Sequence, residues 1–138
     1  MGKGIREVMS SNPCAIDADK PVSDAAKMMR DEDVGLAPIV EGDRLVGALT
    51  DRDIAIRVVA EGKDPASTLV RDVASRDLVT VDPEQDLDEA LRLMAQHQVR
   101  RLPVVAEDGK LVGVVAQADV ARQSDDKKTG EVVERISQ

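Results

Sequence analysis

Residues 34–53 read VGLAPIVEGDRLVGALTDRD, and residues 99–119 read VRRLPVVAEDGKLVGVVAQAD. The two stretches follow one pattern in which Asp53 corresponds to Asp119, and the second copy carries one extra residue in its turn. The similarity extends upstream to matching apolar positions, which are Val22, Ala25, Met28 and Met29 in one copy and Leu87, Ala90, Leu93 and Met94 in the other. A long period with only two copies predicts a folded pair rather than a solenoid. We expect function in the cleft between the copies, because two like units that face each other create one.

Composition favours one domain made of two interdependent halves. The chain has 138 residues, and a unit of about 60 residues buries too little surface to be stable alone. Phe, Trp and Tyr are absent although 42% of residues are hydrophobic, so the core must consist of Val, Leu, Ile, Ala and Met. Without aromatic rings the chain lacks the usual stacking platform for single-stranded nucleic acid. The formal net charge of −8 also argues against binding to nucleic acid or to an anionic membrane.

No apolar run approaches the roughly 18 residues of a membrane span, and the amino-terminal MGKGIREVM lacks the apolar segment of a secretory signal. We therefore expect a cytoplasmic protein that does not bind membranes. Cys14 is the only cysteine, which excludes an internal disulfide, and we expect it to be reduced. Because it begins an apolar stretch, we predict that it is a small buried hydrophobe. The alternative is an intermolecular or redox-sensing thiol.

Hydrophobic periodicity predicts the same order of elements in both copies. In the first copy we expect a strand at 14–16, a helix that is capped by Ser23 or Asp24 and runs to about Asp33 before the helix breaker Gly35, strands at 36–40 and 45–49 around the turn 41–44, and a helix from 50–51 to about Gly62. In the second copy we expect a strand at 78–81, a helix from Pro83 to about 98, strands at 101–106 and 110–116, and a helix from Gln117 to about 123. Short helical lead-ins at 5–9 and 69–73 precede the copies, and Thr129 can cap a last helix at 130–136.

Each copy thus reads β-α-β-β-α, and the order LPVV followed by GKLVGVVAxxD resembles the CBS domain. Two such copies in register are similar to a tandem CBS pair, the Bateman module, and the motifs TDRDI and HQVRRLPV resemble stand-alone bacterial two-CBS proteins. The resemblance implies an α/β (α+β) fold in which two β-α-β-β-α repeats pack by pseudo-two-fold symmetry. We place repeat 1 at 5–62, a linker at 63–68, repeat 2 at 69–122, and a polar tail with a short carboxy-terminal helix at 123–138.

The sequence Thr50-Asp51-Arg52-Asp53 lies where a predicted strand gives way to a helix, and helix amino termini favour phosphate. By the CBS resemblance, Asp53 would accept hydrogen bonds from both ribose hydroxyls and Thr50 would hold a phosphate oxygen. The competing interpretation is a capping box, which stabilises a helix by about 0.5–2 kcal/mol and needs no ligand. In the second copy the corresponding run begins with Ala116, which has no hydroxyl, so the cleft of Asp53 is the better candidate.

Arg100 and Arg101 stand directly before a predicted internal strand, where apolar residues would be expected. By the resemblance, a basic residue just before Leu-Pro reaches the phosphate from the opposite repeat, and a guanidinium suits bidentate phosphate recognition. Arg101 alternates with Leu102, so it points either to the cleft or to solvent. The alternative is that the two arginines balance carboxylates at a surface or at a dimer contact.

The residues that the resemblance assigns to the ligand are Thr50, Arg52, Asp53, Ile16, Pro38, Thr80, Arg100, Arg101, Pro103 and Asp119. In the absence of aromatic rings, apolar residues such as Ile16 and Pro38 would have to enclose an adenine. His97 is the only histidine and has no Cys, His or carboxylate cluster at ligand spacing, so we predict no zinc site. A glycine-rich phosphate loop is also absent from the sequence.

These observations favour a regulatory or sensory module that binds an adenine nucleotide such as AMP, with ADP and ATP as other candidates, and signals to an effector protein. We expect a homodimer formed through the helices that begin near Ser23, Asp51, Asp86 and Gln117. One alternative is a structural or protein-interaction dimer without a ligand. The other is an enzyme, and the lack of a nucleophile paired with a base argues against it. We predict no required cofactor.

Overall fold

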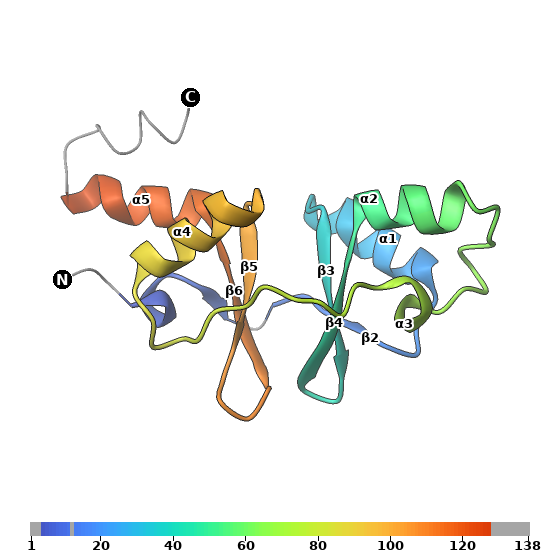
Figure 1. Ribbon diagram of the computed structural model, residues 1–138, viewed down its shortest axis with the longest axis horizontal. Helices are drawn as coiled ribbons and strands as arrows, with labels where there is room; N and C mark the ends of the chain where they lie inside the picture. Colours follow the sequence, from blue (N-terminus) through green and yellow to red (C-terminus); the bar gives the residue numbers. More distant parts are fainter. Residues whose placement is uncertain (1–3, 12, 128–138) are drawn as a thin grey trace. The chain divides into compact units, whose positions relative to one another are not determined.

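The computed structural model of the protein describes residues 4–11 and 13–127 (Figure 1). Of these, residues 14–78 and 108–111 form one compact unit, called unit 2. Residues up to Pro13, residues 79–107 and residues from Val112 onward form the other, called unit 1. The described residues contain two three-stranded sheets together with helices, which confirms the predicted α/β (α+β) class.

The sheet of unit 2 has the order β2-β3-β4. Strand β2 (Ile16–Asp17) runs parallel to β3 (Leu36–Glu41), and β3 pairs antiparallel with β4 (Arg44–Thr50). The turn between β3 and β4 places Gly42 at a φ of +66°, a left-handed conformation that glycine adopts without steric cost. The predicted hairpin is therefore confirmed, whereas the predicted first strand is shorter and begins only at Ile16.

The helices of unit 2 are α1 (Val22–Glu32), α2 (Asp51–Ile54), the π-helical turn η2 (Ala55–Val59) and α3 (Val70–Val73). The prediction that Ser23 or Asp24 caps α1 was wrong, because the amino-terminal cap position is Pro21. Among the described residues, no side chain forms a capping hydrogen bond there. The helix ends at Glu32, and Asp33 caps it with a left-handed φ of 55°, which agrees with the end predicted near Asp33. The helix predicted from Asp51 is present, although its π-helical second half was not foreseen.

Unit 1 contains the sheet β1-β6-β5, with β1 (Ser10–Ser11), β5 (Arg101–Val105) and β6 (Leu111–Ala116). Its helices are η1 (Ile5–Glu7), α4 (Leu87–His97) and α5 (Gln117–Lys127). Strand β1 pairs with β6 opposite Gly113, where a Cβ atom would lie 2.6 Å from the Met9 sulfur and 2.8 Å from the Ser10 carbonyl oxygen. Only glycine allows β1 to approach β6 this closely.

Three predictions for the second repeat were wrong in detail. The strand expected at 78–81 is reduced to one isolated bridge, between Val81 and Val104. The helix expected from Pro83 begins at Leu87, because a turn precedes it in which the Asp82 N–H donates to the Gln85 side chain over 2.8 Å. Helix α5 continues to Lys127 and does not end near Gln123. The helix predicted at 130–136 lies outside the described residues.

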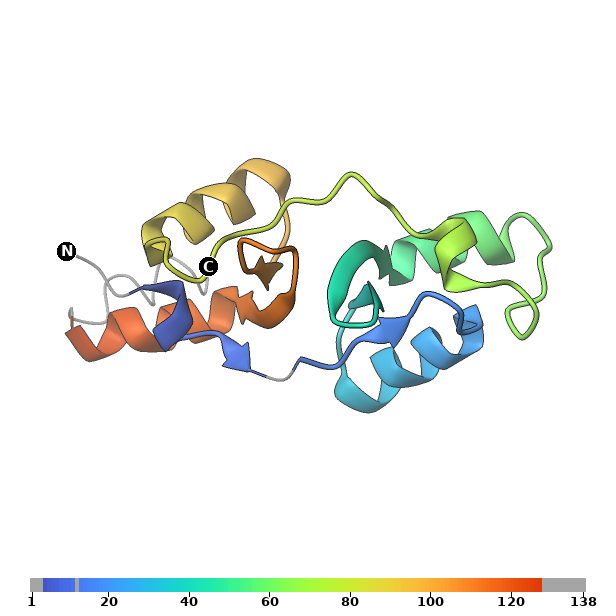
Figure 2. The same cartoon turned by 90° about the horizontal axis from the view of Figure 1, so that it is seen from below.

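The lead-in of each sequence repeat packs into the unit built mainly from the other repeat (Figure 2). Ile5 of η1 is fully buried in the core of unit 1, and its N–H donates to the Gln85 carbonyl over 2.8 Å. Val70 and Val73 of α3 are buried in the core of unit 2. Burial of such a side chain contributes about 1.5–3 kcal/mol, so both hydrophobic cores depend on an exchanged segment.

Candidate functional site

The run Thr50-Asp51-Arg52-Asp53 forms a closed capping box at the start of α2. The Thr50 Oγ1 accepts a hydrogen bond from the Asp53 N–H over 3.0 Å, and the Asp53 Oδ2 accepts one from the Thr50 N–H over 2.9 Å. Both bonds satisfy amide groups that a helix start leaves without partners. The capping interpretation of these residues is therefore correct, and it leaves a second role open because neither side chain has used its full hydrogen-bonding capacity.

Arg57 lies behind the capping box, one turn along the same helical stretch. Its Nε is 4.0 Å from the Asp53 Oδ1, and its Nη1 donates to the Val73 carbonyl oxygen over 2.9 Å. The side chain of Asp53 is only 15% exposed, whereas that of Arg57 is 48% exposed. A positive charge thus stands beside a nearly buried carboxylate and links it to the end of α3.

The other predicted site residues of unit 2 are spread along its sheet. Pro38 is buried on β3, opposite Ala48 of β4, and the half-buried Ile16 lies on β2 opposite Ile39. Arg52 is exposed on α2. Unit 2 therefore brings Thr50 and Asp53 into direct contact and places Pro38 on the adjoining strand, while Arg52 faces solvent.

In unit 1 two of the predicted site residues, Arg100 and Asp119, lie at the start of α5. The carbonyl of the exposed Arg100 accepts a hydrogen bond from the Gln117 N–H over 2.8 Å, and Arg101 is half-buried at the first position of β5. Asp119 forms an ion pair with Arg122. Pro103 is buried on β5, and Thr80 is exposed.

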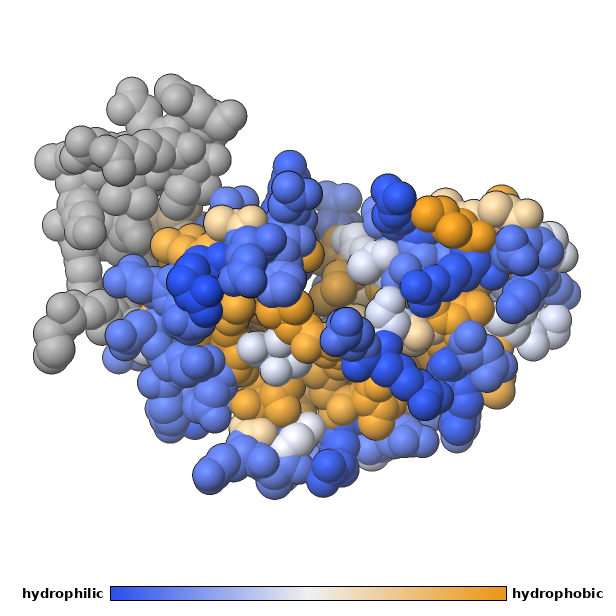
Figure 3. Space-filling model, viewed as in Figure 1, coloured by the Kyte–Doolittle hydropathy of each residue, from blue (hydrophilic) through white to orange (hydrophobic). Residues whose placement is uncertain are grey.

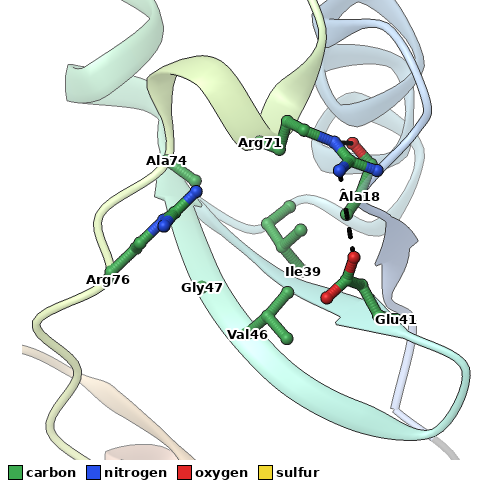
Figure 4. Close-up of a pocket in the computed structure, with 8 residues that line it drawn as sticks. All are labelled: Ala18, Ile39, Glu41, Val46, Gly47, Arg71, Ala74 and Arg76. Carbon is green, nitrogen blue, oxygen red and sulfur yellow. Dashed lines mark hydrogen bonds and ion pairs between the residues drawn. The ribbon is translucent and has the colours of Figure 1, made fainter.

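Unit 2 also contains a pocket of about 210 Å³ that sequence reasoning missed (Figure 4). Its lining combines small or aliphatic residues with three charged ones, namely Ala18, Ile39, Val46, Gly47, Ala74, Glu41, Arg71 and Arg76. The sequence held one signal, two arginines close together, Arg71 in the lead-in of repeat 2 and Arg76 just after it. None of these residues belongs to the predicted ligand set.

Cys14 is exposed, so the prediction that it is buried was wrong. Desolvation and the carboxylate of Glu32 raise the pKa of its thiol above the ordinary value. A raised pKa keeps the thiol protonated, and the thiol form is a poor nucleophile.

No helix within residues 4–11 and 13–127 combines the length and the apolarity needed to cross a bilayer.

Two proteins with similar sequences cover most of the chain. The CBS domain-containing protein YhcV of Bacillus subtilis is 40% identical over 134 residues, which are 96% of this chain and 94% of that protein. Hypoxic response protein 1 of Mycobacterium tuberculosis is 40% identical over 118 residues, which are 85% of this chain and 82% of that protein.

Solved structures share the fold. A crystal structure of Hypoxic Response Protein I with two coordinated zinc ions is 39% identical, has a TM-score of 0.79 and covers 87% of this chain and 98% of its own. A crystal structure of CBSX2 in complex with AMP has a TM-score of 0.79 at 24% identity, over 91% of this chain and 98% of its own, and that likeness is one of fold.

Residues 4–11 and 13–127 do not fit a zinc site of the usual kind. A structural zinc ion needs four Cys, His or carboxylate ligands, and the described part of the chain holds no group of three or more such side chains placed to share an ion.

A model of the CBS domain matches residues 5–60 and again residues 70–126. The two matches fall on the two copies of the sequence pattern and together cover most of the chain. With both relatives aligned over more than four fifths of their own length, the chain belongs to the CBS domain family, as a protein with two CBS domains.

Proposed function

We propose that this protein is a regulatory module that binds an adenine nucleotide, AMP first among AMP, ADP and ATP, and passes the signal to an effector protein. CBS pairs are regulatory modules. The observation that carries the nucleotide proposal is the nearly buried carboxylate of Asp53, held in place at a strand-to-helix turn. A cytoplasmic location is part of the proposal, and in that compartment we expect Cys14 to be reduced.

The capping box leaves Asp53 and Thr50 able to bind a ligand. A carboxylate has about four acceptor positions, and the Asp53 Oδ2 uses one of them for the Thr50 N–H. The Oδ1 is 4.0 Å from Arg57, which is too far for a hydrogen bond. Two ribose hydroxyls can therefore donate to Asp53 without breaking the cap. The Thr50 hydroxyl accepts from Asp53 and keeps its own proton for a phosphate oxygen.

We propose Arg101 as the phosphate ligand, with Arg100 as the weaker candidate. Arg101 is half-buried whereas Arg100 is exposed, and a guanidinium that is partly shielded from water binds phosphate more strongly. The backbone carbonyl of Arg100 accepts a hydrogen bond from Gln117. A substitution of the Arg100 side chain leaves that bond intact.

Calorimetric titration of the full chain with AMP and with adenosine tests the proposal. We expect AMP to bind with a dissociation constant below about 1 mM, and we expect Arg101→Ala to weaken AMP while leaving adenosine nearly unchanged, since adenosine has no phosphate. Arg92→Ala is the matched control, because Arg92 is an exposed arginine of unit 1 that pairs with Glu89. Failure of AMP to bind the wild-type chain at millimolar concentration would exclude the nucleotide.

The alternative, a protein-interaction dimer, is favoured by a different observation. Ile56 and Val59 of η2 are 48% and 68% exposed, and Figure 3 shows apolar surface over the helical end of unit 2. Exposed apolar side chains gathered on one helix mark interaction surfaces. Sedimentation equilibrium checks this reading. We expect a dimer in the micromolar range, and a monomer throughout would contradict both the alternative and the predicted homodimer.

A further inference from the structure

The pocket of unit 2 is built by close backbone approach. One wall is the segment 74–76, which is fixed to β4 by two hydrogen bonds between the backbones of Ala48 and Ser75, 3.0 and 2.9 Å long. A Cβ atom on Gly47 would lie 3.1 Å from the Ser75 carbonyl oxygen and 3.4 Å from the Ala74 Cβ. The absence of a side chain at Gly47 lets the wall approach the strand and leaves room at the base of the pocket.

The two arginines of the pocket are in different electrostatic states. Arg71 is anchored, because its Nε donates to the Ala18 carbonyl oxygen over 3.3 Å, and its guanidinium pairs with Asp19 and lies 3.9 Å from Glu41. Arg76 is exposed and has no hydrogen-bond or ion-pair partner within residues 4–11 and 13–127. In a chain with a net charge of −8, an unpaired guanidinium at a pocket favours an anion.

The remaining lining selects an aliphatic body of small size. Ile39 and Val46 project into the pocket from the two strands, as Figure 4 shows, and Ala18 and Ala74 add apolar walls. The volume of about 210 Å³ is below the roughly 300–1,000 Å³ typical of sites for drug-sized ligands. The pocket therefore suits a small metabolite and is too small to enclose a nucleotide.

We propose that this pocket binds a small aliphatic carboxylate, an α-amino acid or the corresponding 2-oxo acid. The ligand's carboxylate pairs with Arg76, and its aliphatic chain packs on the partly exposed Val46, next to the buried Ile39. Glu41, at the rim, holds the α-ammonium group when the ligand is an amino acid.

The proposed carboxylate site is separate from the proposed nucleotide site. The two share no residue, and Gly47 and Thr50 are three residues apart on β4, a distance of about 10 Å along a strand. Each proposal can therefore fail without the other.

The test is an amide NMR titration of the full chain with leucine and, in a second arm, with 4-methyl-2-oxopentanoate. We expect saturable shifts at the amides of Gly47, Ala74 and Ser75, with a millimolar dissociation constant for at least one ligand. Arg76→Gln should weaken binding about tenfold or more, since it removes a charged hydrogen-bond donor. Arg30→Gln is the matched control, because Arg30 is an exposed arginine of the same unit that pairs with Asp31.

Further variants distinguish an amino acid from a 2-oxo acid as the ligand and separate the carboxylate proposal from the nucleotide proposal. Glu41→Gln should weaken leucine but not the 2-oxo acid, because only leucine carries an ammonium group. Asp53→Asn should leave the affinity for the aliphatic carboxylate unchanged while it weakens AMP. No saturable binding of either ligand at about 10 mM, equal affinity in Arg76→Gln, or identical shifts with inorganic phosphate would each overturn the proposal.

Discussion

Units 1 and 2 begin their second helices on the same backbone frame. In unit 2 the Asp51 N–H donates to the carbonyl of Gly35 over 3.0 Å, and in unit 1 the Gln117 N–H donates to the carbonyl of Arg100 over 2.8 Å. Each bond joins the first residue of a helix, α2 or α5, to the residue that directly precedes a strand of the same unit, β3 or β5. The frame is made of backbone groups, so it forms although Gly35 and Asp51 of unit 2 are replaced by Arg100 and Gln117 in unit 1.

The aspartate that both frames carry is held in two ways. Asp53 takes part in a reciprocal capping box with Thr50. Ala116 has no hydroxyl for such a box, and Asp119 pairs with Arg122 on the next turn. One side chain before the helix thus decides whether the carboxylate is fixed by the backbone or pairs with an exposed guanidinium, and a fixed acceptor is the better preorganised one for a ribose.

The largest expected effect separates the two aspartates. Asp53→Ala should weaken AMP by about 30- to 150-fold, because two hydrogen bonds to a charged acceptor contribute about 2–3 kcal/mol. Asp119→Ala should cost far less at that site. Calorimetric titration measures both, with circular dichroism as the check on folding. Equal AMP binding by wild type and Asp53→Ala would reduce the Thr50–Asp53 turn to a helix cap.

A second difference concerns the glycines at corresponding places in the two sheets. Gly113→Ala should destabilise the protein by about 1–3 kcal/mol, since the new Cβ would meet the Ser10 carbonyl at 2.8 Å and the Met9 sulfur at 2.6 Å. Gly47→Ala should cost less, because its nearest atom is 3.1 Å away. Urea unfolding midpoints compare them. Gly4→Ala, with its nearest contact at 3.8 Å, is the control, and a larger loss for Gly47→Ala would contradict the ranking.

Exchanging the capping residues should exchange the behaviour of the two turns. Thr50→Ala should destabilise the chain by about 1 kcal/mol because the hydroxyl cap is lost. Thr50→Ser keeps the hydroxyl and serves as the control. Ala116→Thr should stabilise by a similar or smaller amount, as Asp119 completes a new box. Thermal unfolding of the three variants gives the result, and a neutral Thr50→Ala would show that the box contributes nothing.

The smallest expected effect lies at Cys14, which corresponds to Val79 in the second repeat. Because its pKa is raised by desolvation and by Glu32, less thiolate is present at a given pH below that pKa, and alkylation by iodoacetamide should be slower than for a free thiol. Glu32→Gln should raise the rate a few-fold. An unchanged rate in that variant would exclude the carboxylate as a cause.

Local patterns predicted the hairpins of both repeats correctly. Two short apolar runs on either side of the turn Glu41-Gly42-Asp43-Arg44 indicate strands β3 and β4. The Thr50–Asp53 cap was also visible, because both partners lie within one helical turn. Where local signals competed, the prediction failed: Ser23 and Asp24 looked like caps of α1, yet the helix begins earlier, after Pro21.

The pocket and the segment exchange could not be read from local sequence. The pocket exists because the backbones of Ser75 and Ala48 pair across a long stretch of chain, and no periodicity reports such a contact. The same holds for Ile5, whose apolar character predicts burial but does not say in which core. The strand expected at 78–81 failed for a related reason, since only Val81 finds a partner.

The exchanged lead-ins bear on how the chain comes apart. The core of unit 2 needs α3, which precedes repeat 2 in the sequence, and the core of unit 1 needs η1, which precedes repeat 1. Removal of either segment therefore opens the core into which it packs. A protease cut in the stretch 63–68 would separate the two repeats. The first fragment would carry η1 but lack α3, which its core needs, and the second fragment would carry α3 but lack η1. We therefore expect each fragment to be unfolded alone and the two fragments to fold when they are mixed, which is fragment complementation.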